Sequence, residues 1–273
     1  MMQGAASAWT TRDRASVLRA RDRALFAHFL RRELTSRYLG SVTGLAWALL
    51  SPLALLGVYD FVFTNVFRAT GFAGSSFLAF VAVALWPWIA AQEALMRGTL
   101  SLPGYAGMIR KVAFPHELVV LASVLATLAL QFAGYVAVLV VLKLMGQPIH
   151  LSGFALAIPI WLIVALGISG IALALAAVQV FVRDVEHVLA PLLMILMYVT
   201  PILYPVSLVP ESVRSIVAAN PLGWVVERLR DALLDGRLAL VWSDAIAVVT
   251  ALLLFAAGHW VFRRLSPHFE DFV

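Results

Sequence analysis

Six apolar runs dominate the chain, and their length limits what it can fold into. A helix needs about 20 mostly apolar residues to cross a bilayer core of about 30 Å. Five runs meet this requirement, at residues 44–67, 77–96, 118–142, 154–182 and 238–262. The sixth, at 188–204, is shorter and contains Pro191 and Pro201, which remove backbone donors and kink a helix. We predict an all-α polytopic membrane protein with six transmembrane helices, the fifth of which is broken at its outer end.

The composition agrees with this prediction. Hydrophobic residues occupy 62% of the 273 positions and charged residues only 13%, whereas a soluble domain is about one quarter charged. Six spans leave no room for an additional folded soluble domain. We therefore expect one transmembrane domain at 44–262, preceded by a cytoplasmic segment at 1–43 and followed by a cytoplasmic tail at 263–273.

The distribution of Lys and Arg predicts the orientation, because cytoplasmic loops carry an excess of these residues. With the N-terminus inside, the inner segments hold 14 of the 20 Lys and Arg residues and the outer segments hold six. Eight of the 14 precede the first apolar run. We therefore predict that both termini are cytoplasmic.

The N-terminal segment contains an amphipathic stretch. Its apolar side chains recur at helical spacing: Leu25, Phe26, Phe29, Leu30 and Leu34. Arginines occupy other faces of the same predicted helix, which is typical of a helix that lies along an anionic membrane surface. An ordinary basic segment next to the membrane is the simpler alternative, and it predicts nearly the same behaviour.

Residues 205–237 form a second amphipathic region, on the predicted outer side. Pro210 can open a short helix, Asn220-Pro221 interrupts it, and Gly236 can close the helix that follows. That second helix carries one apolar stripe: Leu222, Val225, Val226, Leu229 and Leu233. Glu227, Arg230 and Asp231 lie off the stripe. We predict a re-entrant helical hairpin that dips into the outer leaflet.

The sequence contains few candidates for catalysis. No GxxxxGK[ST] loop and no HExxH motif occurs, the six histidines are scattered, and cysteine is absent. We expect no metal site, no cofactor within this chain and no enzymatic activity of its own. The basic residues lie between apolar runs and account for orientation, so nucleic acid is not an expected partner.

Residues 101–117 are the most informative cytoplasmic segment. They contain Arg110 and Lys111 beside apolar residues, then Phe114-Pro115 and Glu117. An aromatic anchor, orienting charges and a proline stop suit a helix that docks into another protein. Alone, this pattern is also compatible with an ordinary basic loop.

Several motifs occur in order along the chain and together resemble one family. They are Arg37-Tyr38-x-x-Ser41-x-x-Gly44-x-x-Trp47, Ser51-Pro52-Leu53, Tyr59-x-x-Val62-Phe63, Leu85-Trp86-Pro87-Trp88, Arg183-Asp184-Val185, Thr200-Pro201-Ile202-x-Tyr204-Pro205 and Asn220-Pro221. With residues 101–117 as a coupling helix, the set is similar to type-2 ATP-binding-cassette exporter permeases of the O-antigen, capsule and teichoic acid branch. One departure is Pro103-Gly104, where the family commonly has Asn, which leaves the start of the coupling helix open.

The resemblance implies a permease subunit in the inner membrane of a bacterium. It implies a homodimer that works with a separate ATPase subunit, which binds ATP and Mg, and exports a lipid-linked glycan. The implied ATPase contacts are Arg110, Lys111, Phe114, Pro115 and Glu117, with a second contact at Arg183 and Asp184. The hairpin at 205–237 is a plausible outer gate.

Aromatic side chains are candidates for lining the glycan path, because their faces bind sugar C–H faces without fixed hydrogen bonds. The candidates are Tyr59, Phe63, Trp86, Trp88, Tyr198 and Tyr204. Trp and Tyr are also enriched at membrane interfaces in general, so packing or lipid contact is a competing explanation. For Phe63 it is the favoured one.

Two other functions are compatible with parts of the sequence. A related exporter permease for drugs or small lipids would share the fold and the ATPase. A polytopic transferase acting on lipid-linked sugars would need acids or histidines clustered at one membrane depth, and the sequence shows no such cluster.

Overall fold

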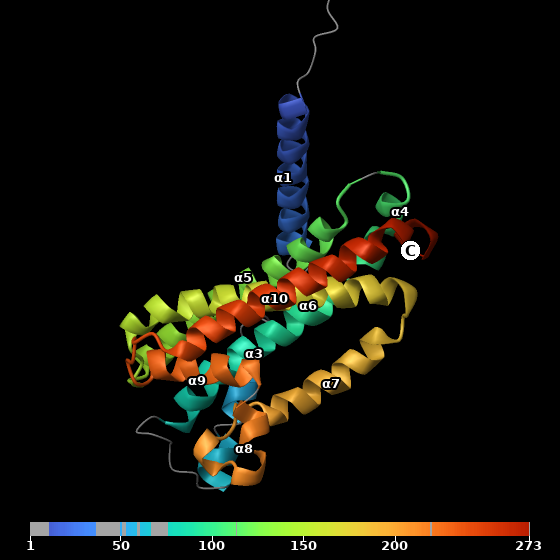
Figure 1. The fold of residues 1–273 in the computed structure, drawn as a ribbon. Helices are drawn as coiled ribbons and strands as arrows, with labels where there is room; N and C mark the ends of the chain where they lie inside the picture. Colours follow the sequence, from blue (N-terminus) through green and yellow to red (C-terminus); the bar gives the residue numbers. More distant parts are fainter. Residues whose placement is uncertain are drawn as a thin grey trace, which may run out of the picture.

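The computed structural model of the chain is helical (Figure 1). It describes residues 11–36, 50, 53–58, 61–66, 76–112, 114–218 and 220–272, and no β-strand occurs among them. The all-α prediction is therefore confirmed for these ranges. A helix satisfies its backbone groups within one segment, which a bilayer requires.

Four helices of the described ranges are long and apolar enough to cross a membrane. They are α3 (Phe77–Thr99), α5 (Glu117–Leu144), α6 (Phe154–Phe181), which continues a 3-10 turn η3 (Leu151–Gly153), and α10 (Trp242–Leu265). These helices match four of the predicted spans. The last one begins at Trp242 rather than at residue 238, because the Asp244 carboxylate accepts the Val241 N–H at 3.0 Å and caps the helix there.

The fifth predicted span is shorter than expected. Its helix, α7 (Val185–Val199), has 15 residues, or about 22 Å at 1.5 Å per residue, against about 30 Å of hydrocarbon. The helix ends because Thr200 takes an extended backbone, with φ −81° and ψ 134°, as expected before Pro201. Figure 1 shows α7 leaving the α6 end and diverging from α6 and α10, and its far end returns to contact α3.

The first predicted span, 44–67, lies largely outside the described residues. Within it, residues 53–58 are helical, and a π-helical turn η1 covers Val62–Val66. The six-span layout therefore stays a prediction, whereas the helices at four of its positions are established.

The N-terminal helix α1 (Thr11–Ser36) projects from the bundle at a steep angle and meets it at one end, next to α5 (Figure 1). Phe29 is buried, and Leu25, Phe26 and Leu30 are partly buried against the core. Arg21, Arg23, Arg31 and Arg32 are exposed. The apolar stripe read from the sequence therefore faces the protein. The Arg32 guanidinium reaches back over the Tyr105 ring, 4.6 Å from its centroid. Contact of this helix with a membrane surface stays a prediction.

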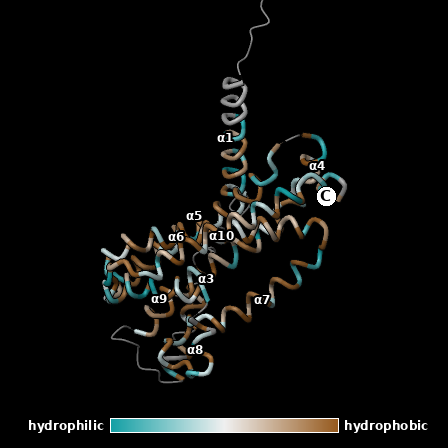
Figure 2. The backbone as a smooth tube through the Cα atoms, in the orientation of Figure 1, coloured by the Kyte–Doolittle hydropathy of each residue, from teal (hydrophilic) through white to brown (hydrophobic). Residues whose placement is uncertain are grey.

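Helices α3, α5 and α6 form the centre of the bundle, and α10 packs along α6. The α6–α10 contact is close at two glycines: a Cβ added at Gly258 would overlap the carbonyl oxygen of Gly170. Small residues that let two backbones meet are a common device between membrane helices. Figure 2 shows hydrophobic residues along α7 and α10 and hydrophilic residues gathered at the connections.

The connections form two ends of the bundle. At the coupling end, η2 (Leu102–Tyr105) and α4 (Ala106–Ile109) join α3 to α5, and η5 (Ser266–His268) and α11 (Phe269–Phe272) follow α10. At the hairpin end, η4 (Val206–Leu208), α8 (Glu211–Ala218) and α9 (Pro221–Leu233) join α7 to α10. The two hairpin helices break at Asn220-Pro221, where the sequence placed the break. Insertion of the hairpin into a leaflet stays a prediction.

Candidate functional site

The predicted coupling segment is only partly helical. Helix α4 ends at Ile109, so the chain from Arg110 to His116 leads to α5 without further helix in its described residues. The prediction of a helix that runs to Phe114 was therefore wrong. Gly104 and Gly107 lower the helix propensity of the segment, and Pro115 disfavours helical backbone at the residue before it.

Phe114 points into the protein, not outward. It is 8% exposed, and its ring centroid lies 5.7 Å from that of Phe29 in α1 and 5.0 Å from that of His116. Tyr105 lies beside the same Phe29 ring at 5.3 Å, and its hydroxyl donates to Glu33 at 3.4 Å. These aromatic contacts fix the coupling segment against α1. Phe114 is therefore placed to shape the segment more than to touch a partner directly.

Two charged residues of the segment are accessible. Arg110 and Lys111 are exposed. Pro115 is half-buried, and Glu117 forms an ion pair with Arg263 of α10, with 3.3 Å between Oε1 and Nη2. Of the five residues predicted here, two present charge to the surroundings, and the other three belong to the packing of the coupling end.

The second predicted contact lies at the corner between α6 and α7. Arg183 and Asp184 are exposed there. The buried Gln179 side chain holds the corner: its amide donates to the Arg183 carbonyl at 3.1 Å, and its carbonyl accepts the Glu186 N–H at 3.2 Å. Two hydrogen bonds of Gln179 therefore brace this corner, which carries an adjacent Arg and Asp at its tip.

Two of the predicted path aromatics are buried inside the chain. Trp86 and Trp88 are 1% and 3% exposed. The Trp86 Nε1–H donates to the Gln131 carbonyl at 3.0 Å, and the Trp88 Nε1–H donates to Gln92 Oε1 at 3.1 Å. Gly134 makes room for the Trp86 indole, since a Cβ there would lie 2.7 Å from the ring. These contacts place Trp86 in the packing between α3 and α5, and Trp88 is buried and bonded within α3.

The other path candidates lie elsewhere. Tyr198, on α7, is 61% exposed. Tyr204 is half-buried, and its hydroxyl donates to the Tyr198 carbonyl at 2.8 Å. Tyr59 and the Phe63 side chain lie outside the described residues. The structure therefore brings Tyr198 and Tyr204 together at the hairpin end of α7.

Arg230 is a residue whose importance the sequence did not reveal. The amphipathic pattern placed it off the buried stripe of α9, yet it is only 6% exposed. Its guanidinium donates to the carbonyls of Pro201 and Ile202, both at 2.7 Å, and to Glu227 at 3.0 Å. Burial lowers the pKa of Arg230 to about 10, which leaves it charged at neutral pH. It ties the hairpin to the turn that ends α7.

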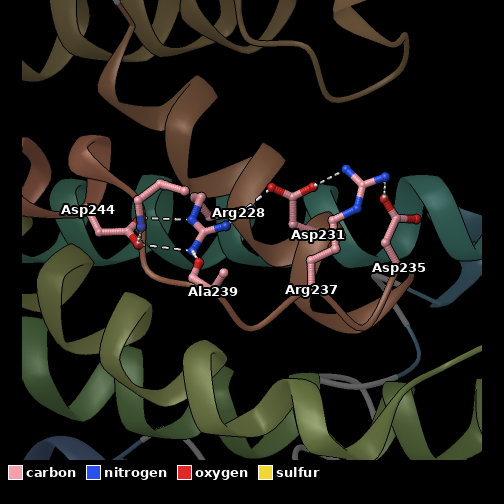
Figure 3. Close-up of polar contacts among 7 residues, drawn as sticks. Arg228, Asp231, Asp235, Arg237, Ala239 and Asp244 are labelled. Carbon is pink, nitrogen blue, oxygen red and sulfur yellow. Dashed lines mark hydrogen bonds and ion pairs between the residues drawn. The ribbon is translucent and has the colours of Figure 1, made fainter.

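A second buried arginine joins α9 to α10 (Figure 3). Arg228 pairs with both carboxylate oxygens of Asp244, with distances of 2.7 Å and 2.9 Å, and donates to the Ala239 carbonyl at 2.9 Å. Asp231 forms ion pairs with Arg228 at 3.3 Å and with Arg237 at 3.4 Å. The fork geometry of Arg suits this bidentate arrangement. Sequence separation hid the pair, because Asp244 belongs to the next span.

Polar side chains also meet between α3 and α5 within the membrane-length helices. Gln131 of α5 donates to Glu93 Oε2 at 2.5 Å, and Arg97 donates to Glu93 Oε1 at 2.8 Å. This pairing neutralises the Glu93 charge. Among the described residues, no three His, Asp or Glu side chains gather in a way that could hold a metal ion.

Comparison with known proteins agrees with this architecture. Residues 24–234 match the family model described as ABC-2 type transporter. The chain is 32% identical over 255 residues to the O-antigen export system permease protein RfbA of Myxococcus xanthus, with 91% of this chain and 95% of that protein covered. It is 27% identical over 245 residues to the Klebsiella pneumoniae protein of the same name, covering 88% of this chain and 91% of the relative.

A third relative is a polysialic acid transport protein. The chain is 24% identical over 230 residues to the polysialic acid transport protein KpsM of Escherichia coli, covering 82% of this chain and 87% of the relative. The matched region contains α3, the coupling segment, α7 and both hairpin helices, so family and fold coincide over most of the chain. The chain is a membrane subunit of the ABC-2 type transporter family.

Proposed function

We propose that this chain is the permease subunit of an ABC transporter that exports a lipid-linked polysaccharide across the bacterial inner membrane. The observation that carries the proposal is the near full-length similarity to permeases named for O-antigen export and polysialic acid transport. The four long apolar helices supply the membrane domain. ATP and Mg would be bound by a separate ATPase subunit, the usual partner in this family.

The coupling end offers a surface for that ATPase. Arg110 and Lys111 are exposed on one segment, and Arg183 and Asp184 on another, and both segments are held by packed neighbours. A rigid, charged surface suits a partner that pushes on it, because movement passes through packed elements without being absorbed. We assign the direct contact to these four residues. Phe114, Pro115 and Glu117 position the segment that carries the first two.

The exposed face of α7 supports a homodimer. Val188, Leu192, Met194, Ile195 and Tyr198 are 55–63% exposed on this helix. Helix α7 is short, and the turn that follows it, from Thr200 to Tyr204, is irregular backbone. A bilayer tolerates such backbone where protein or a water-filled cavity covers it. Arg230 of the same chain already binds the Pro201 and Ile202 carbonyls of that turn. A second copy would instead cover the exposed apolar face of α7 and would enclose a path between the two permeases.

Tyr198 and Tyr204 are the aromatics best placed for such a path. Tyr198 projects from the exposed face of α7, and the Tyr204 hydroxyl donates a hydrogen bond to the Tyr198 backbone carbonyl. The hairpin held by Arg230 lies next to them in the chain and would close the outer end. In this proposal Trp86 and Trp88 support the wall of the bundle and do not contact the glycan.

A deletion strain tests the function. Removing this chain from its host should abolish one surface polysaccharide and accumulate its lipid-linked form inside the cell, and the wild-type chain should restore export. Normal surface glycan in the deletion strain, together with loss of drug or small-lipid efflux, would assign the chain to the other branch of exporters. The matched control is the deletion of the cognate ATPase, which should give the same phenotype.

A further inference from the structure

The last described residues of the chain fold back onto the coupling end. Helix α11 has four residues, and its first, Phe269, has no exposed surface. The Phe269 ring centroid lies 5.9 Å from that of His116, 5.3 Å from that of Phe262 and 6.0 Å from that of Phe181. One side chain of the tail thus contacts the α4–α5 connection, the end of α10 and the end of α6.

The contacts of Phe269 lie next to both charged surfaces described above. His116 packs against Phe114, which follows Arg110 and Lys111 in the coupling segment. Phe181 ends α6 directly before the corner at Arg183 and Asp184. A continuous row of aromatic contacts therefore runs from Phe114 through His116 and Phe269 to Phe181.

Packed rings of this kind transmit displacement. Protein interiors are dense and compress little, so a shift of one ring must move or repack its neighbours. Helix α11 is a single turn, too short to be stable alone, so its position depends on these contacts. A further contact at this end is the Glu117–Arg263 ion pair, which joins α5 to α10 at 3.3 Å. The Arg263 side chain of this pair is 67% exposed, so the ion pair stabilises this end less than the buried ring contacts do.

We propose that Phe269 is the positioning residue that makes the coupling segment and the α6–α7 corner move as one unit when the ATPase moves. The proposal rests on the proposed function, since it needs an ATPase that contacts both surfaces. The C-terminal tail then acts as a wedge between two docking surfaces, and its deletion uncouples them. Without the ring of Phe269, the coupling segment and the corner respond to the ATPase separately.

The test measures glycan exported per ATP hydrolysed by the purified permease–ATPase complex in proteoliposomes. Phe269→Ala should lower this ratio by at least about fivefold, because it loses the ring contacts with His116 and Phe181 that join the two surfaces, while the complex still assembles and hydrolyses ATP. Phe269→Leu keeps the apolar bulk and should stay within about twofold of wild type. Phe272→Ala is the matched control, because Phe272 is 53% exposed and contacts Phe181 but has no ring contact with His116 in the described structure.

The ratio separates coupling from stability. A role in stability alone would lower the amount of complex and leave the ratio unchanged, and that result overturns the proposal. If Phe269→Ala does not accumulate, His116→Ala replaces it, because it removes the same ring contact from the other side. A ratio within about twofold of wild type in that variant would contradict a link through this contact. A wild-type complex that hydrolyses ATP but exports no glycan would contradict the proposed function instead.

Discussion

The guanidinium of Arg230 lies over the Phe80 ring, with 3.4 Å between its Cζ atom and the ring centroid. Phe80 belongs to the first turn of α3, and Arg230 belongs to the last turn of α9. The same guanidinium also binds the two carbonyls of the turn after α7. One buried cation therefore joins the outer hairpin, the start of α3 and the end of α7.

Removing this cation should destabilise the hairpin end. Arg230→Ala leaves the buried carbonyls of Pro201 and Ile202 without their donors, so we expect a loss of about 2–5 kcal/mol of unfolding free energy. Thermal unfolding of the purified chain in detergent measures it. Arg237→Ala is the control, since Arg237 is 70% exposed in its ion pairs and should change stability by no more than about 1 kcal/mol. Equal losses in the two variants would contradict the assigned role.

The close contact of α6 and α10 predicts a strict size limit at Gly258. An alanine there places a Cβ against the Gly170 carbonyl, and separating the helices should cost about 1–3 kcal/mol. Gly107→Ala serves as the control, because nothing lies within 4 Å of a Cβ at that position. It should be neutral or stabilise by up to about 1 kcal/mol. The free energies of unfolding of both variants, measured in the same detergent, test this contact. A Gly258→Ala variant as stable as Gly107→Ala would contradict it.

Reversing the exposed charges of the coupling segment should weaken binding of the ATPase. Arg110→Glu combined with Lys111→Glu replaces attraction by repulsion at a docking surface, and we expect at least about a tenfold loss of affinity. The permease alone should fold normally, since both side chains are exposed. Co-purification with the ATPase measures the loss. Arg214→Glu, an exposed reversal on α8, should leave ATPase binding unchanged, and a loss there would show that the assay reports net charge only.

The coupling end should lose stability in mild acid through His116. Burial lowers the pKa of His116 below its usual value of 6.5, and the nearby carboxylates of Glu117 and Glu270 only partly offset this. In the folded chain, His116 therefore becomes protonated at a lower pH than it does in the unfolded chain. The contribution of neutral His116 to the free energy of unfolding is complete above pH 6.5, and it falls as the pH drops below that value. His116→Gln should lose less stability than wild type between pH 7.5 and about pH 5.5. The same slope in both proteins would contradict this cause.

Much of the fold could be predicted from the sequence, because membrane-length apolar runs leave few alternatives. Helices α3, α5, α6 and α10 lie where the apolar runs indicated. The hairpin helices α8 and α9 are separated at Asn220-Pro221, as the proline predicted. The helix α1 forms where its apolar spacing indicated, but the stripe packs against the protein core, whereas the sequence predicted contact with a membrane surface. In each case a local signal, length, proline or period, determined the structure.

The details that failed depend on contacts between distant segments. Phe114 was expected to face outward, but Phe29 of α1 and His116 enclose it. Arg230 was predicted to lie off the buried stripe, yet it is buried and donates hydrogen bonds to carbonyls of the turn after α7. Arg228 and Asp244 form a pair across two elements that no spacing rule connects. A buried arginine can be foreseen only when its partners are known, and here the partners are backbone carbonyls and a carboxylate in another helix.

ATP-dependent transport in proteoliposomes tests the central claim most directly. Vesicles would hold the purified chain with its ATPase and receive the lipid-linked glycan on the face that carries the ATPase. We predict that the glycan becomes protected from an added glycosidase only when ATP, the ATPase and this chain are all present, and that the Arg110→Glu, Lys111→Glu variant abolishes protection. Glycan that stays accessible while the same vesicles move a drug or a small lipid would contradict the proposed function.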